Sequence, residues 1–170
     1  KSDWQTQTQP ASESVLPMIR VAFYAHQVSE AADMTRHATE HGYESTVHYL
    51  VEMCRLVLDR TGLLPHANAG ALYEDELAAL RPVAPSQGMM IETLRGDLPA
   101  HRGSPDKTPE RRLATLEAAG RLGIPFTTGI LVGIGEDRAD RVAALEAIAA
   151  AHRRHGHVQE VIVQNFLPKP

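Results

Sequence analysis

The chain has 170 residues, of which 43% are apolar, and its 17 basic and 21 acidic side chains give a net charge of −4. This length suits one domain with its own core, and the acidic balance argues against a protein that binds nucleic-acid backbones. No apolar run approaches the roughly 18 residues of a membrane span, and the polar start lacks the apolar core of a secretion signal.

Residues 1–14 consist mainly of Gln, Thr, Ser and Pro, a composition that predicts a flexible tail. We leave residues 1–35 unassigned as a leader and expect one domain over residues 36–170. Cys54 is the single cysteine, which excludes an internal disulfide and any cluster held by several cysteines of this chain. A lone cysteine also suits a reduced compartment, so we expect a cytoplasmic protein.

Helical spacing of apolar residues predicts helices over residues 45–58, 73–80, 108–120 and 137–152. Ser45 is the expected N-cap of the first helix, and Cys54 is expected in its buried face. Thr108 caps the third helix with Pro109 at its first position. The expected buried face of the last helix consists of Val142, Leu145, Ile148 and Ala149.

Short apolar runs predict strands at residues 63–64, 88–91, 124–132 and 158–166, with the second and the last buried on both faces. Strands that alternate with helices form parallel sheets with right-handed crossovers. The fold class is therefore α/β with about four parallel strands. A closed eight-stranded barrel needs about 250 residues, so we expect an open sheet or a partial barrel.

Polar residues follow each predicted strand, where parallel α/β folds bind ligands. They are His66, Asn68 and Gly70, then Glu92 and Thr93, then Gly133, Gly135 and Glu136, and finally Gln164 and Asn165. Polar groups gathered at one rim predict a small-molecule site.

The run from Gly129 to Glu136 allows two interpretations. Its glycines could let a ligand approach the backbone, or they could form a tight turn with positive φ, followed by Glu136 as an ordinary acid of the first helical turn. The run is neither a Walker loop nor a Rossmann fingerprint, because Arg138 stands where the third glycine of that fingerprint belongs.

Basic side chains also allow two interpretations. Arg111 and Arg112 lie near a helix start, where a cation opposes the helix dipole, so one of them has an anionic partner or both are solvated. His66 and His101 could each be a metal ligand or an ordinary loop histidine, and we expect no metal site in this chain.

Four stretches together resemble a known family: Thr61–Gly70, Gly88–Glu92, Ile124–Glu136 and Gln159–Pro170. They resemble the 7,8-didemethyl-8-hydroxy-5-deazariboflavin (FO) synthases, radical S-adenosylmethionine (SAM) enzymes, over about residues 36–170. The resemblance implies a partial (β/α) barrel of the TIM type found in the radical SAM superfamily.

The resemblance also implies site residues. Gly129, Leu131, Gly133 and Glu136 match the motif G-x-I-x-G-x-x-E that holds the adenine of SAM, with Leu131 in place of Ile. Arg112 matches the arginine that pairs with the methionine carboxylate, which suits its guanidinium fork. Glu92 is implied near the methionine amino group or the ribose. His66, Asn68 and Asn165 are implied to face the substrate.

In the family, a [4Fe–4S] cluster and SAM act on tyrosine and 5-amino-6-(D-ribitylamino)uracil to form the deazaflavin chromophore of coenzyme F420, a lyase-type synthesis. The resemblance assigns no catalytic residue here. The cofactor supplies the difficult step, and the protein orients the reactants.

The family's C-x-x-x-C-x-x-C cluster loop is absent from the chain. We therefore expect a fragment that spans about the third to sixth barrel strands and is inactive alone. Its expected partners are small-molecule substrates and either the missing barrel half or a partner synthase subunit, not nucleic acid or membrane. The alternatives are a cluster-less barrel that binds SAM or a nucleoside, and another radical SAM branch of the futalosine or biotin type.

Overall fold

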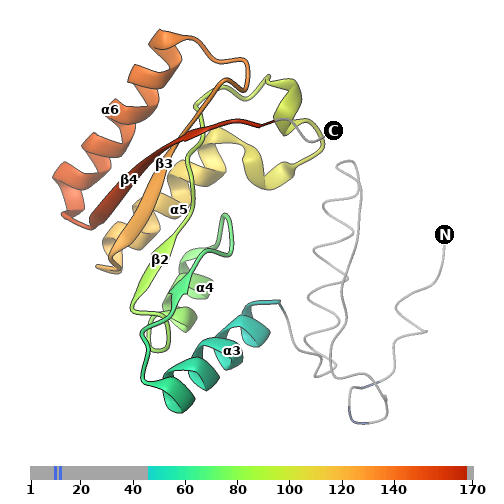
Figure 1. Cartoon of the computed structure of the whole chain (residues 1–170), viewed down its shortest axis with the longest axis vertical. Coiled ribbons are helices and arrows are strands. Elements are labelled where there is room, and N and C mark those ends of the chain that lie inside the picture. The colour runs from blue at the N-terminus through green and yellow to red at the C-terminus, as the bar shows by residue number, and fades with distance from the viewer. Residues whose placement is uncertain (1–9, 11, 13–45, 168–170) are drawn as a thin grey trace. The chain divides into compact units, whose positions relative to one another are not determined.

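The computed structural model describes residues 10, 12 and 46–167 (Figure 1). The expectations for the leader and for Ser45 as a cap lie outside the described residues. The described helices are α3 (Thr46–Thr61), α4 (Glu74–Leu80), α5 (Pro109–Arg121) and α6 (Arg138–His155), with short 3-10 turns η3 (Pro99–His101) and η4 (Pro105–Lys107). The described strands are β1 (His66–Ala67), β2 (Ser86–Gly88), β3 (Phe126–Val132) and β4 (Val158–Asn165).

The four strands form one parallel sheet in the order β1-β2-β3-β4, so each strand pairs with the next one along the chain. Such an order follows from successive crossovers of one hand, which is how a (β/α) barrel grows. The predicted alternation, the fold class and the number of strands are confirmed.

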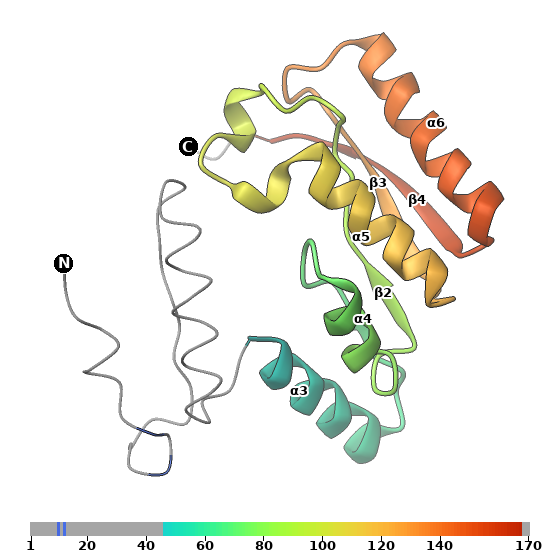
Figure 2. The same cartoon turned by 180° about the vertical axis from the view of Figure 1, so that it is seen from behind.

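Helices α5 and α6 pack against each other and against β3, and both are seen on one side of the sheet (Figure 2). Because side chains alternate along a strand, every second residue of β3 is directed toward these helices. Phe126, Thr128 and Ile130 are buried there, together with Leu116 of α5 and Ile148 of α6. We refer to the opposite side of the sheet as the far face.

Both long crossover helices begin at well-formed caps. The Thr108 side chain accepts a hydrogen bond from the backbone N–H of Arg111, with Pro109 in the first turn, as predicted. Asp137 and Asp140 form a capping box at the start of α6. At its other end, Gly156 adopts φ 68°, a left-handed conformation that glycine reaches without a steric cost.

Strand β4 corrects one prediction, because the structure does not bury it. Val161 and Val163 are 44% and 63% exposed. β4 stands at one edge of the described sheet, where it has a partner strand on one side only. An apolar pattern reports what a strand can bury, but not whether a neighbour is present to cover it.

The apolar face of α6 is also displaced from the prediction. Val142, Leu145 and Ala149 are exposed, whereas Ala144, Ile148 and Ala151 are buried. Small alanines let the helix approach β3 closely, so the larger side chains turn toward β4 instead.

Two strand boundaries differ from the sequence-based expectation. Leu63 and Leu64 are 66% and 74% exposed and precede β1, which begins at His66. β2 starts at the polar Ser86, and Met89–Glu92 continue beside β3, since the N–H of Met89 donates to Thr127 O and Glu92 bridges to Ile130. The apolar run at Met89–Ile91 therefore lies in the continuation of β2, whereas the run at Leu63–Leu64 lies before β1 and is exposed.

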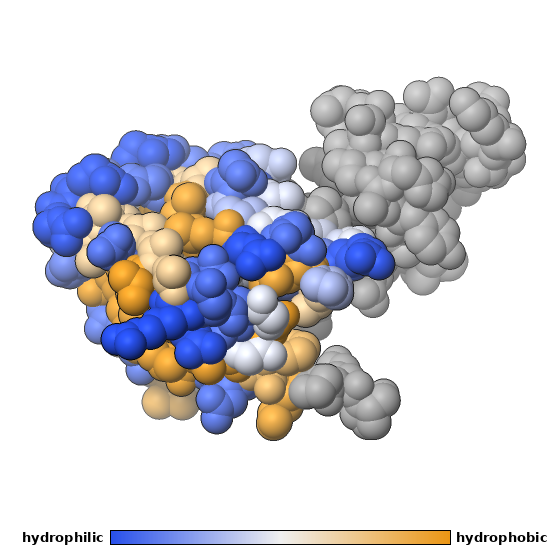
Figure 3. Space-filling model, turned by 90° about the horizontal axis from the view of Figure 1, so that it is seen from above, coloured by the Kyte–Doolittle hydropathy of each residue, from blue (hydrophilic) through white to orange (hydrophobic). Residues whose placement is uncertain are grey.

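No helix in the described part of the chain is both long and apolar enough to cross a bilayer. The view from above Figure 1 shows hydrophilic residues lying between hydrophobic patches on that face (Figure 3).

Candidate functional site

Glu92 lies where the extension of β2 ends, directly beside the glycine motif of β3. Its N–H donates to Gly129 O and its carbonyl accepts from the N–H of Leu131, both at 3.0 Å. Glu92 has φ 63°, a left-handed conformation that costs a non-glycine residue free energy. Two neighbouring hydrogen bonds hold this conformation and direct the side chain toward α5.

The Glu92 carboxylate forms ion pairs and hydrogen bonds with side chains from three separate segments. Arg112 of α5 is 3.0 Å away, His101 Nε2 is 2.7 Å away, and Lys107 Nζ donates at 3.1 Å. Burial alone would raise the pKa of Glu92, but the hydrogen bonds and charges of Arg112 and Lys107 hold it below its ordinary value. We refer to these four residues as the Glu92 cluster.

Arg112 is buried and oriented by the protein itself. One terminal nitrogen donates to Ile91 O at 2.8 Å, the other pairs with Glu92, and Nε has no hydrogen-bond partner. Arg112 therefore has the anionic partner that one sequence interpretation required. Arg111 instead stacks over the Tyr73 ring at 3.5 Å and donates to Ala71 O.

Glu136 closes the turn between β3 and α6. Its carboxylate accepts from the N–H groups of Gly133 and Ile134, both at 2.8 Å, and from Arg141 Nε at 2.7 Å. Although burial opposes the charge, these donors lower the pKa of Glu136 to about 2. Glu136 is thus the anchor of the turn and not an ordinary acid of the first helical turn.

The glycines of the motif serve different purposes. Gly133 and Gly135 have φ 96° and 113°, so the interpretation as a turn with positive φ is confirmed. A Cβ on Gly129 would overlap the carbonyl oxygen of Ile162, whereas one on Gly133 would meet nothing within 4 Å. Gly129 therefore permits close pairing with β4, and Gly133 leaves open space beside exposed backbone.

The loop after Glu92 connects the two carboxylate sites. Arg95 pairs with Asp140 at the start of α6, and Leu98 lies 3.3 Å from the Cβ position of Gly135. The structure thus brings Glu92, Arg112, Gly129 and Leu131 together at the carboxyl ends of β2 and β3, with the Gly133–Glu136 turn beside them. The Glu136 carboxylate itself is directed into its own turn.

The three residues predicted to face the substrate lie on the outer strands. His66 is in β1, with Nδ1 2.6 Å from Ser86 Oγ of β2. Asn68 follows β1 and is exposed. Asn165 is the last residue of β4, in register with Val132, and is also exposed.

A metal centre is not formed by the described residues, among which no three His, Cys, Asp or Glu side chains could hold an ion. Cys54 is buried, and burial raises the pKa of its thiol. The His101 ring contacts the Glu92 carboxylate. A [4Fe–4S] cluster needs cysteine thiolates, so the residues of this chain do not fit one.

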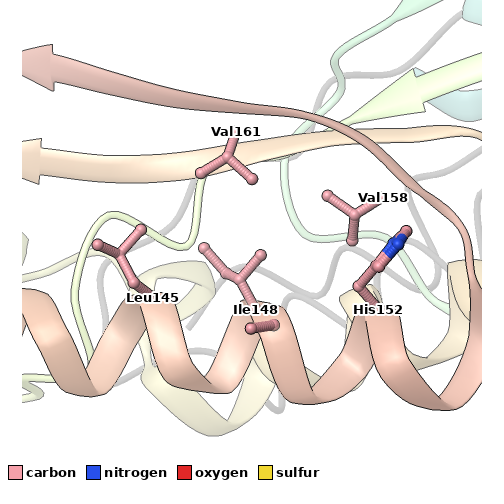
Figure 4. Close-up of a pocket in the computed structure, with 6 residues that line it drawn as sticks. Leu145, Ile148, His152, Val158 and Val161 are labelled. Atoms are coloured by element: carbon pink, nitrogen blue, oxygen red, sulfur yellow. The ribbon is translucent and has the colours of Figure 1, made fainter.

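A hollow of about 230 Å³ lies between α6 and β4, lined by Leu145, Ile148, Ala149, His152, Val158 and Val161 (Figure 4). Its lining is apolar apart from His152, and it includes none of the predicted site residues. It is the gap left where the larger side chains of α6 meet the exposed strand.

Sequence reasoning missed two residues of the site, Lys107 and Arg141, and considered His101 only as a metal ligand. Lys107 immediately precedes the N-cap Thr108, and Arg141 lies one turn after Glu136, so their positions gave a weak signal. His101 gave none, because its contact with Glu92 depends on how the loop between β2 and α5 folds.

Comparisons with known proteins agree with the predicted resemblance, although no protein-family model matches the chain. A 7,8-didemethyl-8-hydroxy-5-deazariboflavin synthase of Methanosarcina mazei is 56% identical over 131 residues, covering 77% of this chain and 38% of the relative. The synthase of Methanosarcina barkeri is 50% identical over 147 residues, covering 86% and 44%. An FO synthase of Mycobacterium tuberculosis is 54% identical over 135 residues, covering 76% and 16%.

Among solved structures, a methylornithine synthase matches with a TM-score of 0.60 and 21% identity over 72% of this chain and 35% of that one. This match concerns the fold alone, and it agrees with the expected partial barrel of the TIM type. The chain spans less than half the length of the relatives named here. Over about three quarters of its length, the chain is thus a homologue of the 7,8-didemethyl-8-hydroxy-5-deazariboflavin synthases.

Proposed function

We propose that this chain provides the SAM-binding strands of a radical SAM enzyme that forms the deazaflavin chromophore from tyrosine and 5-amino-6-(D-ribitylamino)uracil. The observation that carries the proposal is the Glu92–Arg112 pair, held beside the backbone of Gly129 and Leu131. The shared name of the three relatives favours this branch over the biotin and futalosine branches.

The Glu92 cluster suits the methionine end of SAM. Arg112 and Lys107 together outnumber the single carboxylate, which leaves surplus positive charge for a carboxylate ligand. The unpartnered Nε of Arg112 and the half-exposed Lys107 provide the donors. Glu92 in turn provides an acceptor for the ammonium group or for ribose hydroxyls.

The glycine turn suits the adenine end. Open space at Gly133 leaves backbone accessible beside Leu131, which is half-buried. Glu136 contributes by fixing the turn through the N–H groups of Gly133 and Ile134. SAM bound here supplies the adenosyl group for radical chemistry when a cluster is present, but the cluster ligands are not on this chain.

A titration of the ¹⁵N-labelled 170-residue chain with SAM tests the proposal, because NMR detects weak binding without a cluster. We expect the amide signals of Gly129, Leu131 and Gly133 to shift, with the affinity at least tenfold lower in Arg112→Lys because the guanidinium fork is lost. The matched control is Arg121→Lys, which alters an exposed pair with Glu74.

Two results would overturn the proposal. One is the absence of shifts at the motif glycines at millimolar SAM. The other is an equal loss of affinity in both arginine variants while circular dichroism shows that both remain folded. A micromolar affinity would instead support the cluster-less binding protein, because the weak affinity expected here reflects the missing cluster.

A further inference from the structure

The far face of the sheet carries a row of polar side chains. In β3 this row includes Thr127, which precedes Gly129 and Leu131 of the proposed SAM site along the strand. The row crosses all four strands in two steps: His66 pairs with Ser86, and two residues further along β2 Gly88 pairs with Thr127, which pairs with Glu160. Neighbouring strands are about 4.8 Å apart, so the row spans about 14 Å across the sheet. We refer to it as the far-face row.

At one end of the far-face row, His66 is held in a fixed orientation. Its Nδ1 lies 2.6 Å from Ser86 Oγ, and its Nε2 would lie 2.9 Å from a Cβ on Gly88. The ring therefore extends over Gly88, where any side chain would displace it. Since Ser86 engages Nδ1, the Nε2 atom remains over Gly88, which pairs with Thr127 of β3.

At the other end, a β-bulge gathers two polar side chains at one threonine. The register between β3 and β4 shifts from Phe126↔Val158 to Thr127↔Glu160, which inserts Gln159. Gln159 Nε2 donates to Thr127 Oγ1 at 3.0 Å, and the Thr127 hydroxyl donates to Glu160 Oε2 at 3.4 Å. Bulges that redirect a side chain in this way are common near functional sites.

The chemistry of the row identifies the class of ligand. Two hydroxyls, an imidazole, an amide and one carboxylate offer alternating donors and acceptors, and no lysine or arginine stands among them. A phosphate or carboxylate would lack a cationic partner there and would face Glu160. A chain of hydroxyl groups can both donate and accept at each position.

We propose that the far-face row binds the hydroxyl-rich chain of the substrate, with His66 and Thr127 contacting hydroxyls and Ser86 positioning His66. This inference rests on the proposed function, whose ribityl-bearing substrate contains such a chain. The far-face row lies on the side of the sheet opposite α5, whereas the Glu92 cluster lies at the carboxyl ends of β2 and β3 and contacts α5, so the two sites do not overlap.

Ribitol, a neutral five-carbon polyol, is the probe that tests this inference in the 170-residue chain. We expect ribitol to shift the His66 ring signals and the amides of Gly88 and Thr127. Ser86→Ala and Thr127→Val should each weaken binding about fivefold, the effect of one hydrogen bond. The matched control Thr61→Val removes an exposed hydroxyl of α3 and should leave binding unchanged.

Two further probes show which results would contradict the inference. 1,5-Pentanediol has the same carbon chain but only the two terminal hydroxyls, and inorganic phosphate provides an anion. Equal binding of the diol, binding of phosphate to the same signals, or no response to ribitol would each overturn the inference. The SAM titration is monitored at the amide of Gly133, which lies outside the row. A response to SAM without one to ribitol would therefore refute this inference alone. A response to ribitol without one to SAM would refute the proposed function.

Discussion

Two carboxylates at the ends of adjacent strands, Glu92 and Glu136, are stabilised in different ways. Glu136 accepts hydrogen bonds from the backbone of its own turn and from Arg141, five residues further on. Glu92 depends on side chains from η3, η4 and α5, nine to twenty residues away. Both carboxyl groups have lowered pKa values, yet only one of them is fixed by local sequence.

This difference separates a structural anchor from a site that can exchange partners. Backbone donors cannot leave Glu136 unless the turn unfolds. The side chain of Lys107, by contrast, is 37% exposed and can turn from Glu92 to a ligand. A ligand that binds at the Glu92 cluster therefore rearranges side chains, whereas the Glu136 turn acts as a rigid support.

The largest expected effect follows from Glu92→Ala. Arg112 is buried and would lose its carboxylate, which typically costs about 3 kcal/mol or more. The free energy of unfolding from urea denaturation at pH 7 measures this loss. The double variant Glu92→Ala/Arg112→Met should recover part of the stability, because it leaves no unpaired charge. A double variant no more stable than Glu92→Ala would show that the pair is not what the site requires.

Acid should affect the Glu136 turn next most strongly. With a pKa near 2 in the folded state against an ordinary 4.5, Glu136 binds its proton more readily when the chain is unfolded. Its contribution, at most about 3 kcal/mol, is therefore complete above pH 5 and is lost as the pH falls from about 4.5 to 2. Unfolding free energies measured along this pH range should decline steeply.

The variant Glu136→Gln sharpens that measurement. It should be less stable at pH 7 but should show a flatter decline with acid, since one titrating group is removed. Glu92, Asp97 and Glu117, whose pKa values are also lowered, supply the remaining slope. Equal slopes in the variant and the parent chain would contradict the assignment of the acid sensitivity to Glu136.

A smaller effect is expected from Gly133→Ala, which places a side chain at φ 96°. Nothing lies within 4 Å of the new Cβ, so the cost is backbone strain alone, about 1 kcal/mol. Gly129→Ala is the contrasting variant and should cost more, because its Cβ would overlap the Ile162 carbonyl oxygen. The thermal unfolding midpoints of the two variants compare the cost of backbone strain at Gly133 with the cost of a steric overlap at Gly129. A larger loss for Gly133→Ala would reverse this account.

The contrast between the two carboxylates also explains how far the sequence could predict the molecule. The glycine turn, the Thr108 cap and the parallel strand order follow from local patterns, and the structure has all three. Spacing within a few residues fixes such features, because the interacting groups are neighbours along the chain.

The Glu92 cluster was only partly predictable for the opposite reason. The sequence suggested an anionic partner for one arginine, but could not identify Glu92 by itself, since the pair spans twenty residues and a loop. A histidine in a loop, such as His101, suggests a metal ligand as readily as the partner of a carboxylate, which it is here. The exposure of β4 likewise could not be predicted from the sequence, because an apolar strand has the same residue pattern with or without a neighbour that covers it.

The smallest expected effect concerns the loop that joins the two sites. Arg95 pairs with Asp97, which is 68% exposed, and with Asp140, which is 22% exposed and belongs to the capping box of α6. Asp97→Ala should therefore change the unfolding free energy by less than about 0.5 kcal/mol, whereas Asp140→Ala should cost about 1 kcal/mol through the lost cap. Added salt should leave this order unchanged, because the cap is mainly a backbone interaction. Equal losses in the two variants would mean that Arg95, and not the cap, holds the loop against α6.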